Sequence, residues 1–110
     1  MTSPRTDRLP GTLDLLVLRI LAREQMHGWA IAQRLQLISR DVLTVGQGSL
    51  YPALHRLEEV GAIDAEWKMS DASRRGRFYS LTPKGEELLE RERASWKVFT
   101  AAVGRVLQFA

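Results

Sequence analysis

The chain has 110 residues, two histidines and no cysteine, with a formal net charge of +3 and a pI of about 9.8. This length supports one hydrophobic core but no separate ligand-binding domain, and a chain without cysteine cannot form disulfides, thiolate metal sites or thiol switches. The mild basic excess is compatible with nucleic-acid binding, although it is also common among proteins that never touch DNA.

Residues 1–10 are polar and contain arginines, but they lack the apolar stretch of a signal peptide. No apolar run along the chain approaches the length of a membrane span. We therefore expect a cytoplasmic protein that begins with a flexible arm over residues 1–10.

The first helix is expected over residues 12–23, with Thr12 as its N-cap. Its apolar residues cover two faces. One face consists of Leu13, Leu16, Val17, Ile20 and Leu21, and the other of Leu15, Leu18 and Ala22. A helix that is apolar nearly all round is buried from two directions. In so small a domain we expect the second face to contact another subunit; the alternative is complete burial within one chain.

His27-Gly28 interrupts the chain before a second helix, expected over residues 29–39 with Ile31, Leu35 and Ile38 facing the core. Trp29 points away from that stripe, either toward a partner helix or toward a phosphate. His27 is expected to be structural, because nothing near it in the sequence offers a catalytic or metal-binding companion. Residues 42–45 are able to add a very short strand.

The third helix lies within residues 44–61. Leu50, Leu54 and Leu57 repeat at helical spacing, and Gly61 ends the pattern. The opposite face carries polar and aromatic side chains. Taken alone, this pattern favours an ordinary amphipathic helix with a solvated outer face over a helix that reads the major groove of DNA.

Two strands with a polar connection follow. Ile63, Ala65, Trp67 and Met69 alternate with polar residues and predict a half-buried strand. Residues 77–81 form the second strand, with Tyr79 and Leu81 inward. The connection over residues 70–76 carries two adjacent arginines, so the pattern predicts a β-hairpin with a basic tip.

Thr82 and Pro83 predict the start of a last helix, as N-cap and first helical residue. An apolar seam runs along its second half, formed by Trp96, Phe99, Val103 and Val106. Little of the chain remains to cover this seam, so we expect it to pair with another subunit. The element order predicts a mainly α fold with a small β-hairpin: a winged helix-turn-helix over residues 11–82 and a long dimerisation helix over residues 83–110.

Three stretches resemble the PadR-type transcriptional regulators. Residues 48–58 followed by Gly61 resemble the signature helix of that family, and His27-Gly28-Trp29 resembles the His-Gly-Tyr that opens its second helix. Residues 77–85 resemble the wing strand and the Leu-Thr-x-x-Gly after it. The matches span residues 9–107, and they are most similar to the short members with a single C-terminal helix.

The resemblance implies a homodimeric winged-helix repressor that binds inverted-repeat operators, with the first and last helices forming the dimer. In some compact members a tryptophan of the last helix lines a hydrophobic cavity between the subunits, where aromatic effectors stack. Trp96 matches that position by its spacing from the wing. The alternative role for Trp96 is that of a plain interface anchor.

On this basis we expect DNA to contact the leading end of the third helix and the wing. Gln47, Ser49, Pro52 and His55 would face the bases and Gly48 would let the backbone approach, with Tyr51 and Arg56 on the DNA backbone. Arg74, Arg75 and Arg77 would reach phosphates or the adjacent minor groove; the alternative is a solvated tip.

Two other classes of function remain to be weighed. One is a winged-helix adaptor that binds an acidic protein in place of DNA. The other is an enzyme, for which Ser49, His55 and Asp41 are the available triad. No nucleophile elbow, phosphate loop or metal-ligand spacing accompanies these three residues, so we expect neither catalysis nor a cofactor or metal.

Overall fold

The computed structural model describes residues 5–69 and 75–110, with side chains described for residues 11–69 and 75–110. The elements in chain order are α1 (Arg5–Leu21), β1 (Met26–His27), α2 (Gly28–Ile38), α3 (Gln47–Glu59), β2 (Ile63–Met69), β3 (Arg75–Leu81) and α4 (Pro83–Phe109). The expected class, mainly α with a small β-hairpin, is confirmed.

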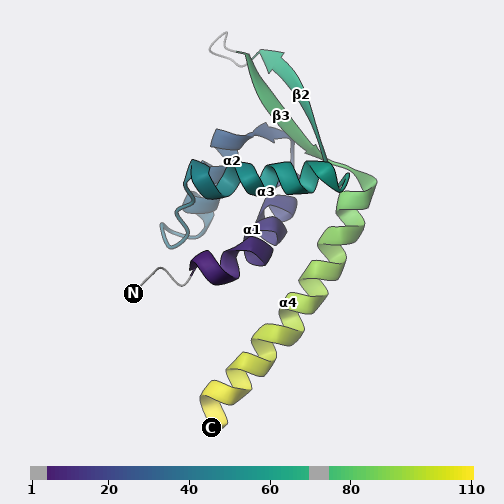
Figure 1. The fold of residues 1–110 in the computed structure, drawn as a ribbon. Helices are drawn as coiled ribbons and strands as arrows, with labels where there is room; N and C mark the ends of the chain where they lie inside the picture. The colour runs from purple at the N-terminus through teal and green to yellow at the C-terminus, as the bar shows by residue number, and fades with distance from the viewer. Residues whose placement is uncertain (1–4, 70–74) are drawn as a thin grey trace.

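Helices α1, α2 and α3 form a compact cluster, from which the β2–β3 hairpin rises at one end and α4 runs away as a long rod (Figure 1). The molecule accordingly measures 55 × 31 × 21 Å. The hairpin and the second half of α4 therefore project from the body in different directions.

The core lies where the three helices meet the base of the sheet. Its largest fully buried side chains are Leu13, Val17, Leu18, Ile31, Leu50, Leu54 and Ile63. Burial of one such side chain stabilises the fold by about 1.5–3 kcal/mol. The apolar stripe expected on α3 is confirmed, since Leu50, Leu54 and Leu57 are all buried. This stripe fixes which face of α3 remains exposed.

Helix α1 differs from the expectation at both ends. It begins at Arg5, so residues 5–10 are helical and Thr12 is not the N-cap. Pro10 lies within this helix; a proline removes one backbone hydrogen bond, but it does not prevent a helix whose later turns pack in a core. Leu18 is 0% and Leu15 8% exposed, so both pack within their own chain, as the alternative of burial within one chain had it, and not on a face left open for another subunit. Ala22 is exposed just after α1.

The small sheet has the antiparallel order β1-β3-β2. Beside the hairpin, the sheet contains the short strand β1, in which Met26 pairs with Tyr79 and His27 with Phe78 of β3. The strand considered for residues 42–45 is not present. The backbone turns there because Arg40 and Asp41 have positive φ angles of 54° and 67°, and the Ser39 hydroxyl accepts a 2.9 Å hydrogen bond from the Leu43 N–H.

Two expectations of burial were wrong. The alternation in β2 holds for Ile63, which is buried, and Ala65, which is half-buried, but Trp67 is 58% and Met69 62% exposed. The hairpin rises from the helical body at this point (Figure 1), and the described residues leave more than half of each of these two side chains in solvent. Ile38, at the end of α2, is likewise exposed.

The junction between α3, β2 and α4 is tightly built. The Thr82 hydroxyl accepts a hydrogen bond from the Gly85 N–H at 3.0 Å and donates one to the Gly61 carbonyl at 2.6 Å, which confirms Thr82 as the N-cap. A Cβ at Gly85 would lie 2.1 Å from the carbonyl oxygen of Ala62. Only glycine permits this approach, and the approach sets the direction in which α4 leaves the body.

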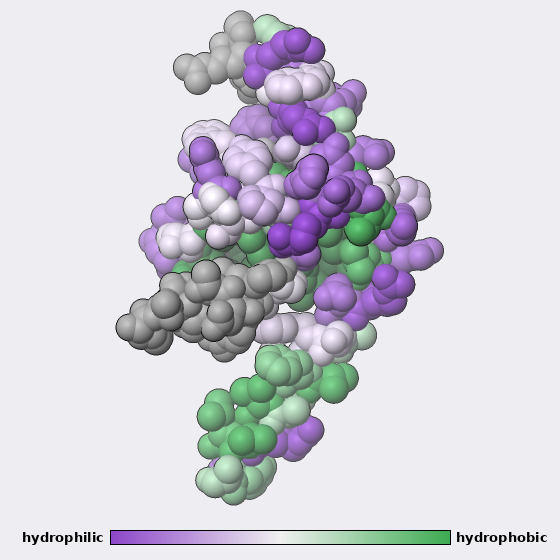
Figure 2. Space-filling model, viewed as in Figure 1, coloured by the Kyte–Doolittle hydropathy of each residue, from purple (hydrophilic) through white to green (hydrophobic). Residues whose placement is uncertain are grey.

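Helix α4 buries little beyond its first turns: within the described chain, its buried residues are Gly85 and Leu89. The expected seam of Trp96, Phe99, Val103 and Val106 is 39–62% exposed, and the apolar surface of the second half of α4 is visible in Figure 2. No helix among the described residues is both long enough and apolar enough to cross a lipid bilayer.

Candidate nucleic-acid interface

The leading end of α3 is open to solvent. Helix α3 begins after Gly46, which caps it without a side chain, and Gln47, Gly48 and Ser49 in its first turn are exposed. Apart from its chain neighbours and the backbone of its own helix, no atom of the described residues lies within 4 Å of the place where a Cβ of Gly48 would be. Backbone N–H groups at such a helix start are free to meet an anion or the edge of a ligand.

The outer face of α3 continues from this end along the helix. Pro52, His55, Arg56 and Glu59 are all exposed on it, opposite the buried leucines. His55 Nε2 lies 3.6 Å from Glu59 Oε2, a loose contact between two exposed side chains. The residues of α3 that the sequence nominated for DNA contact therefore share one solvent-facing surface.

Tyr51 packs on the start of α2. A Cβ added to Gly28 would lie 2.9 Å from the Tyr51 hydroxyl, so the absence of a side chain at Gly28 makes room for the phenol. Tyr51 is still 41% exposed. Part of the Tyr51 side chain therefore packs within the fold, and the exposed part is available to a ligand.

His27 has the structural role that was expected. Its Nδ1 accepts a long, 3.4 Å hydrogen bond from the Ala30 N–H as the N-cap of α2. Its ring also packs edge-on against Phe78 of β3, with ring centroids 5.0 Å apart. His27 therefore connects the start of α2 to the sheet.

Arg56 is held by an acidic partner on another helix. Its Nη2 donates to Asp14 Oδ1 of α1 at 3.0 Å. Burial raises the pKa of Asp14 above its ordinary value of 3.8, although the hydrogen bond and charge of Arg56 act in the opposite direction. Arg56 thus joins α3 to α1, while 46% of its side chain remains exposed.

Arg77 is tied down in the same way. Its Nη2 lies 2.7 Å from Glu58 Oε2, and its guanidinium carbon is 5.7 Å from the centre of the Tyr79 ring. The sequence assigned Arg77 to DNA, whereas the structure uses it to fasten the wing to α3. The sequence contains a sign of this inward position. Arg77 is two residues before the inward-facing Tyr79, and residues two apart in a strand lie on the same face.

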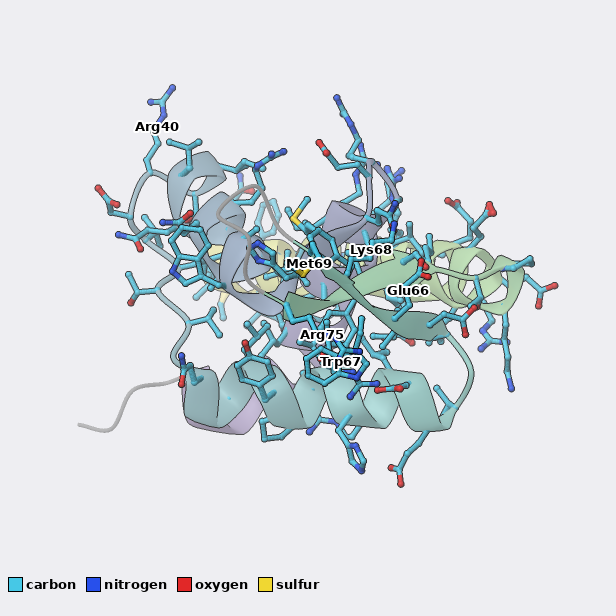
Figure 3. The ribbon with its side chains drawn as sticks, turned by 90° about the horizontal axis from the view of Figure 1, so that it is seen from above. Arg40, Glu66, Trp67, Lys68, Met69 and Arg75 are labelled. Carbon is cyan, nitrogen blue, oxygen red and sulfur yellow. The ribbon has the colours of Figure 1, made fainter. Side chains whose placement is uncertain are left out.

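The exposed part of the wing contains an arginine and a tryptophan. The guanidinium carbon of Arg75 lies 5.3 Å from the centre of the Trp67 ring, and the two side chains lie next to each other on the hairpin (Figure 3). Arg74 falls outside the described residues. The sequence did not predict Trp67 as a surface residue, because the alternation along the strand placed it on the buried face.

A hollow lies between α1 and α4. It has a volume of about 230 Å³ and is lined by Gly11, Thr12, Leu15, Glu92, Ser95, Trp96 and Phe99. The rings of Trp96 and Phe99 are 5.9 Å apart. Three of the side chains assigned to the dimer interface, Leu15, Trp96 and Phe99, are therefore brought together, whereas Val103 and Val106 lie further along α4.

This arrangement defines a class of protein. Helices α2 and α3 form a helix-turn-helix whose second helix is exposed, and the β2–β3 hairpin forms a wing beside it, as in winged-helix DNA-binding regulators. Residues 17–91 match the family described as "Transcriptional regulator PadR-like family". The chain belongs to that family, and its fold is a DNA-binding winged helix of a transcription regulator.

Two individual relatives are similar to most of this chain. The chain is 38% identical over 83 residues to transcriptional regulator Rv3488 of Mycobacterium tuberculosis, covering 76% of this chain and 74% of that protein. It is 42% identical over 95 residues to an uncharacterized 37.1 kDa protein in transposon TN4556 of Streptomyces fradiae, covering 82% of this chain but spanning only 26% of that relative.

Solved structures show the same fold. The PadR-like transcriptional regulator BC4206 of Bacillus cereus superposes with a TM-score of 0.79 at 29% identity, covering 94% of this chain and 99% of that one. A PadR family transcriptional regulator from Eggerthella lenta gives a TM-score of 0.77 at 30% identity, covering 97% and 92% of the two chains.

Proposed function

We propose that this transcriptional regulator is a sequence-specific repressor that binds an inverted-repeat operator as a homodimer. The observation that carries the proposal is the open leading end of α3 beside an exposed wing. The major groove of DNA is wide enough to admit an α-helix, and there the base edges present distinct patterns of hydrogen-bond donors and acceptors.

The base-reading side chains in this proposal are Gln47, Ser49, Pro52 and His55, all of which are exposed on α3. Polar groups in the first turn would bond to base edges, and Pro52 would offer an apolar contact. Gly48 adds no side chain, so the backbone can come close to the duplex. Glu58, paired with Arg77, is outside this set.

The residues that we assign to the DNA backbone differ from those expected from the sequence. Arg75 is the exposed cation of the described wing, and we assign it to a phosphate, with Tyr51 as a further backbone contact. Arg56 and Arg77 support the DNA-binding surface without a proposed DNA contact. Arg56 holds α3 against α1, and Arg77 holds the wing against α3. Phosphate contacts of this kind fix register and leave sequence to the bases.

Homodimer formation would cover the apolar seam of α4. Phe99, Val103 and Val106 are at least 39% exposed in the single chain, an apolar stripe of the kind that a second copy buries. A two-fold axis would present two copies of α3 to the DNA, one helical turn or a multiple of it apart. That symmetry is the reason for proposing an inverted repeat.

The hollow at Trp96 would lie against this dimer interface. We propose that it accepts an aromatic effector, because Trp96 and Phe99 offer two adjacent ring surfaces beside Leu15. The competing role is that of an interface anchor without a ligand. Replacement of Trp96 by Phe, followed by titration with aromatic compounds, separates the two roles: an effector site shows saturable binding that Trp96→Phe weakens, whereas with an anchor alone the substitution leaves any binding of aromatic compounds unchanged.

Electrophoretic mobility shift with the DNA upstream of the protein's own gene tests the proposed function. A regulator of this kind should give a shift that survives competitor DNA and weakens steeply between 50 and 200 mM salt, by a factor of about 10³–10⁵ for 6–10 phosphate contacts. If no sequence-preferring shift occurs with any promoter fragment, the surface binds something other than DNA, as an adaptor for an acidic protein would.

A further inference from the structure

A second cavity lies between the start of α2, the helix α3 and the wing, away from the hollow at Trp96. Its volume is about 440 Å³, within the range of about 300–1,000 Å³ that is usual for small-molecule sites. Its walls include His27, Trp29, Tyr51, Trp67, Arg77 and Tyr79. All of them belong to a single chain, so the cavity exists in each protomer whether or not the protein dimerises.

The cavity walls are formed largely by solvent-exposed aromatic side chains. Trp29 is 60% exposed, Trp67 58% and Tyr51 41%, and the three side chains come from α2, β2 and α3 respectively. Large aromatic groups left in water from three separate elements add little to the core, yet here they line one cavity. Ring faces arranged in this way are suited to stacking against a planar ligand.

Two arginines lie at the cavity, and because Arg77 is paired with Glu58 at 2.7 Å, the excess positive charge among the described residues comes from Arg75. Arg77 lines it, Arg75 lies beside Trp67, and no carboxylate is among the described residues that line the walls. The Nε of Arg77 is buried and has no acceptor among the described residues, even though its Nη2 is bonded to Glu58. These groups favour a ligand with negative charge and hydrogen-bond acceptors over a cation.

We propose that this cavity binds a planar aromatic anion, one per protomer. The ring system stacks on the indoles of Trp29 and Trp67 and the phenol of Tyr51, and the negative group lies toward Arg77 and Arg75. The cavity is distinct from the hollow between α1 and α4, which is smaller, at about 230 Å³, and carries the carboxylate of Glu92. An anion is disfavoured beside that carboxylate.

The three tryptophans of the chain separate the two sites, because Trp29 and Trp67 line one cavity and Trp96 lines the other. The test is a calorimetric titration of the full chain with 2-naphthoate, repeated with 2-naphthamide and 2-naphthyltrimethylammonium as neutral and cationic matches. We expect naphthoate to bind saturably and more tightly than either match. Trp67→Ala should weaken it by about tenfold, the loss of one stacking contact, and Trp29→Ala should also weaken it.

Phe109→Ala is the matched control, because it removes an exposed aromatic ring that lines neither cavity. It should leave the affinity for naphthoate within a factor of about two, well below the loss of one stacking contact. Trp67 is on the exposed wing, so Trp67→Ala should fold, and circular dichroism checks that it does. The proposal is overturned if naphthoate does not bind, if Trp96→Phe abolishes binding while Trp67→Ala does not, or if the cation binds as tightly as the anion. The titration contains no DNA, so its outcome is independent of operator binding.

Discussion

Arg77 Nη2 lies 2.7 Å from Glu58 Oε2, and this ion pair joins the wing to the last turns of α3. Both side chains are partly exposed, at 39% and 32%, so solvent weakens the pair without removing it. The two surfaces proposed to meet DNA are therefore held in a fixed relation by two residues that need not touch DNA.

Glu58→Ala should release the wing. The unfolding free energy should fall by about 1 kcal/mol, because Arg77 loses its partner in a partly buried setting, and affinity should fall similarly for all DNA sequences. Urea denaturation and mobility shift measure the two effects. Glu59→Ala is the matched control, since Glu59 makes only an exposed 3.6 Å contact with His55. Equal behaviour of the two variants would contradict a clamping role for Glu58.

Arg75→Ala should weaken binding to operator and non-operator DNA alike. Loss of one phosphate contact lowers the slope of log K against log salt by about 0.9. The measurement is a salt series for both DNAs, with Lys97→Ala on α4 as a control of equal charge change. An unchanged affinity and slope for Arg75→Ala would show that this arginine does not touch DNA.

How much of this arrangement the sequence could predict depends on the range of the interactions. The leucines of α3 and the Thr82 cap were predicted correctly, because helical spacing and capping are local properties. The Arg77–Glu58 pair spans 19 residues and depends on how the hairpin folds back, which no local pattern reports. Trp67 was misplaced for a related reason: alternation identifies a face of a strand, but not whether anything covers that face.

Asp14 predicts a dependence of stability on pH. Burial raises its pKa in the folded state above the ordinary 3.8, so the folded state holds the proton at pH values where the unfolded chain has lost it. The unfolding free energy should therefore fall as pH rises from about 3.8 through the raised folded pKa. Asp14→Asn should flatten this decline in urea denaturation series, and Asp64→Asn, at an exposed site, should not.

A decline that is identical in wild type and Asp14→Asn would assign the effect to other carboxylates. The same variant retains a hydrogen-bond acceptor for Arg56, so a large uniform loss of stability at every pH is not expected from it.

Phe99→Asp should disrupt the proposed homodimer. Placing a charge on the apolar seam of α4 should raise the dimer dissociation constant by at least about thirtyfold, the equivalent of about 2 kcal/mol for a central interface residue. Sedimentation velocity over a concentration series measures this. Ala101→Asp places the same charge on an exposed part of the helix away from the seam, and it should leave the constant nearly unchanged. Equal effects from both would mean that the seam is not the interface.

Selection of genomic DNA fragments by the purified protein tests the central claim most directly, with wild type compared against Gln47→Ala and Ser49→Ala. We predict that wild type enriches an inverted repeat with half-site centres about 10–10.5 bp apart, or a multiple of that spacing. Each variant should change preference at particular positions of the half-site, by about 1–3 kcal/mol. An enriched motif that is identical in all three proteins, or no motif at all, would contradict base reading by the leading end of α3.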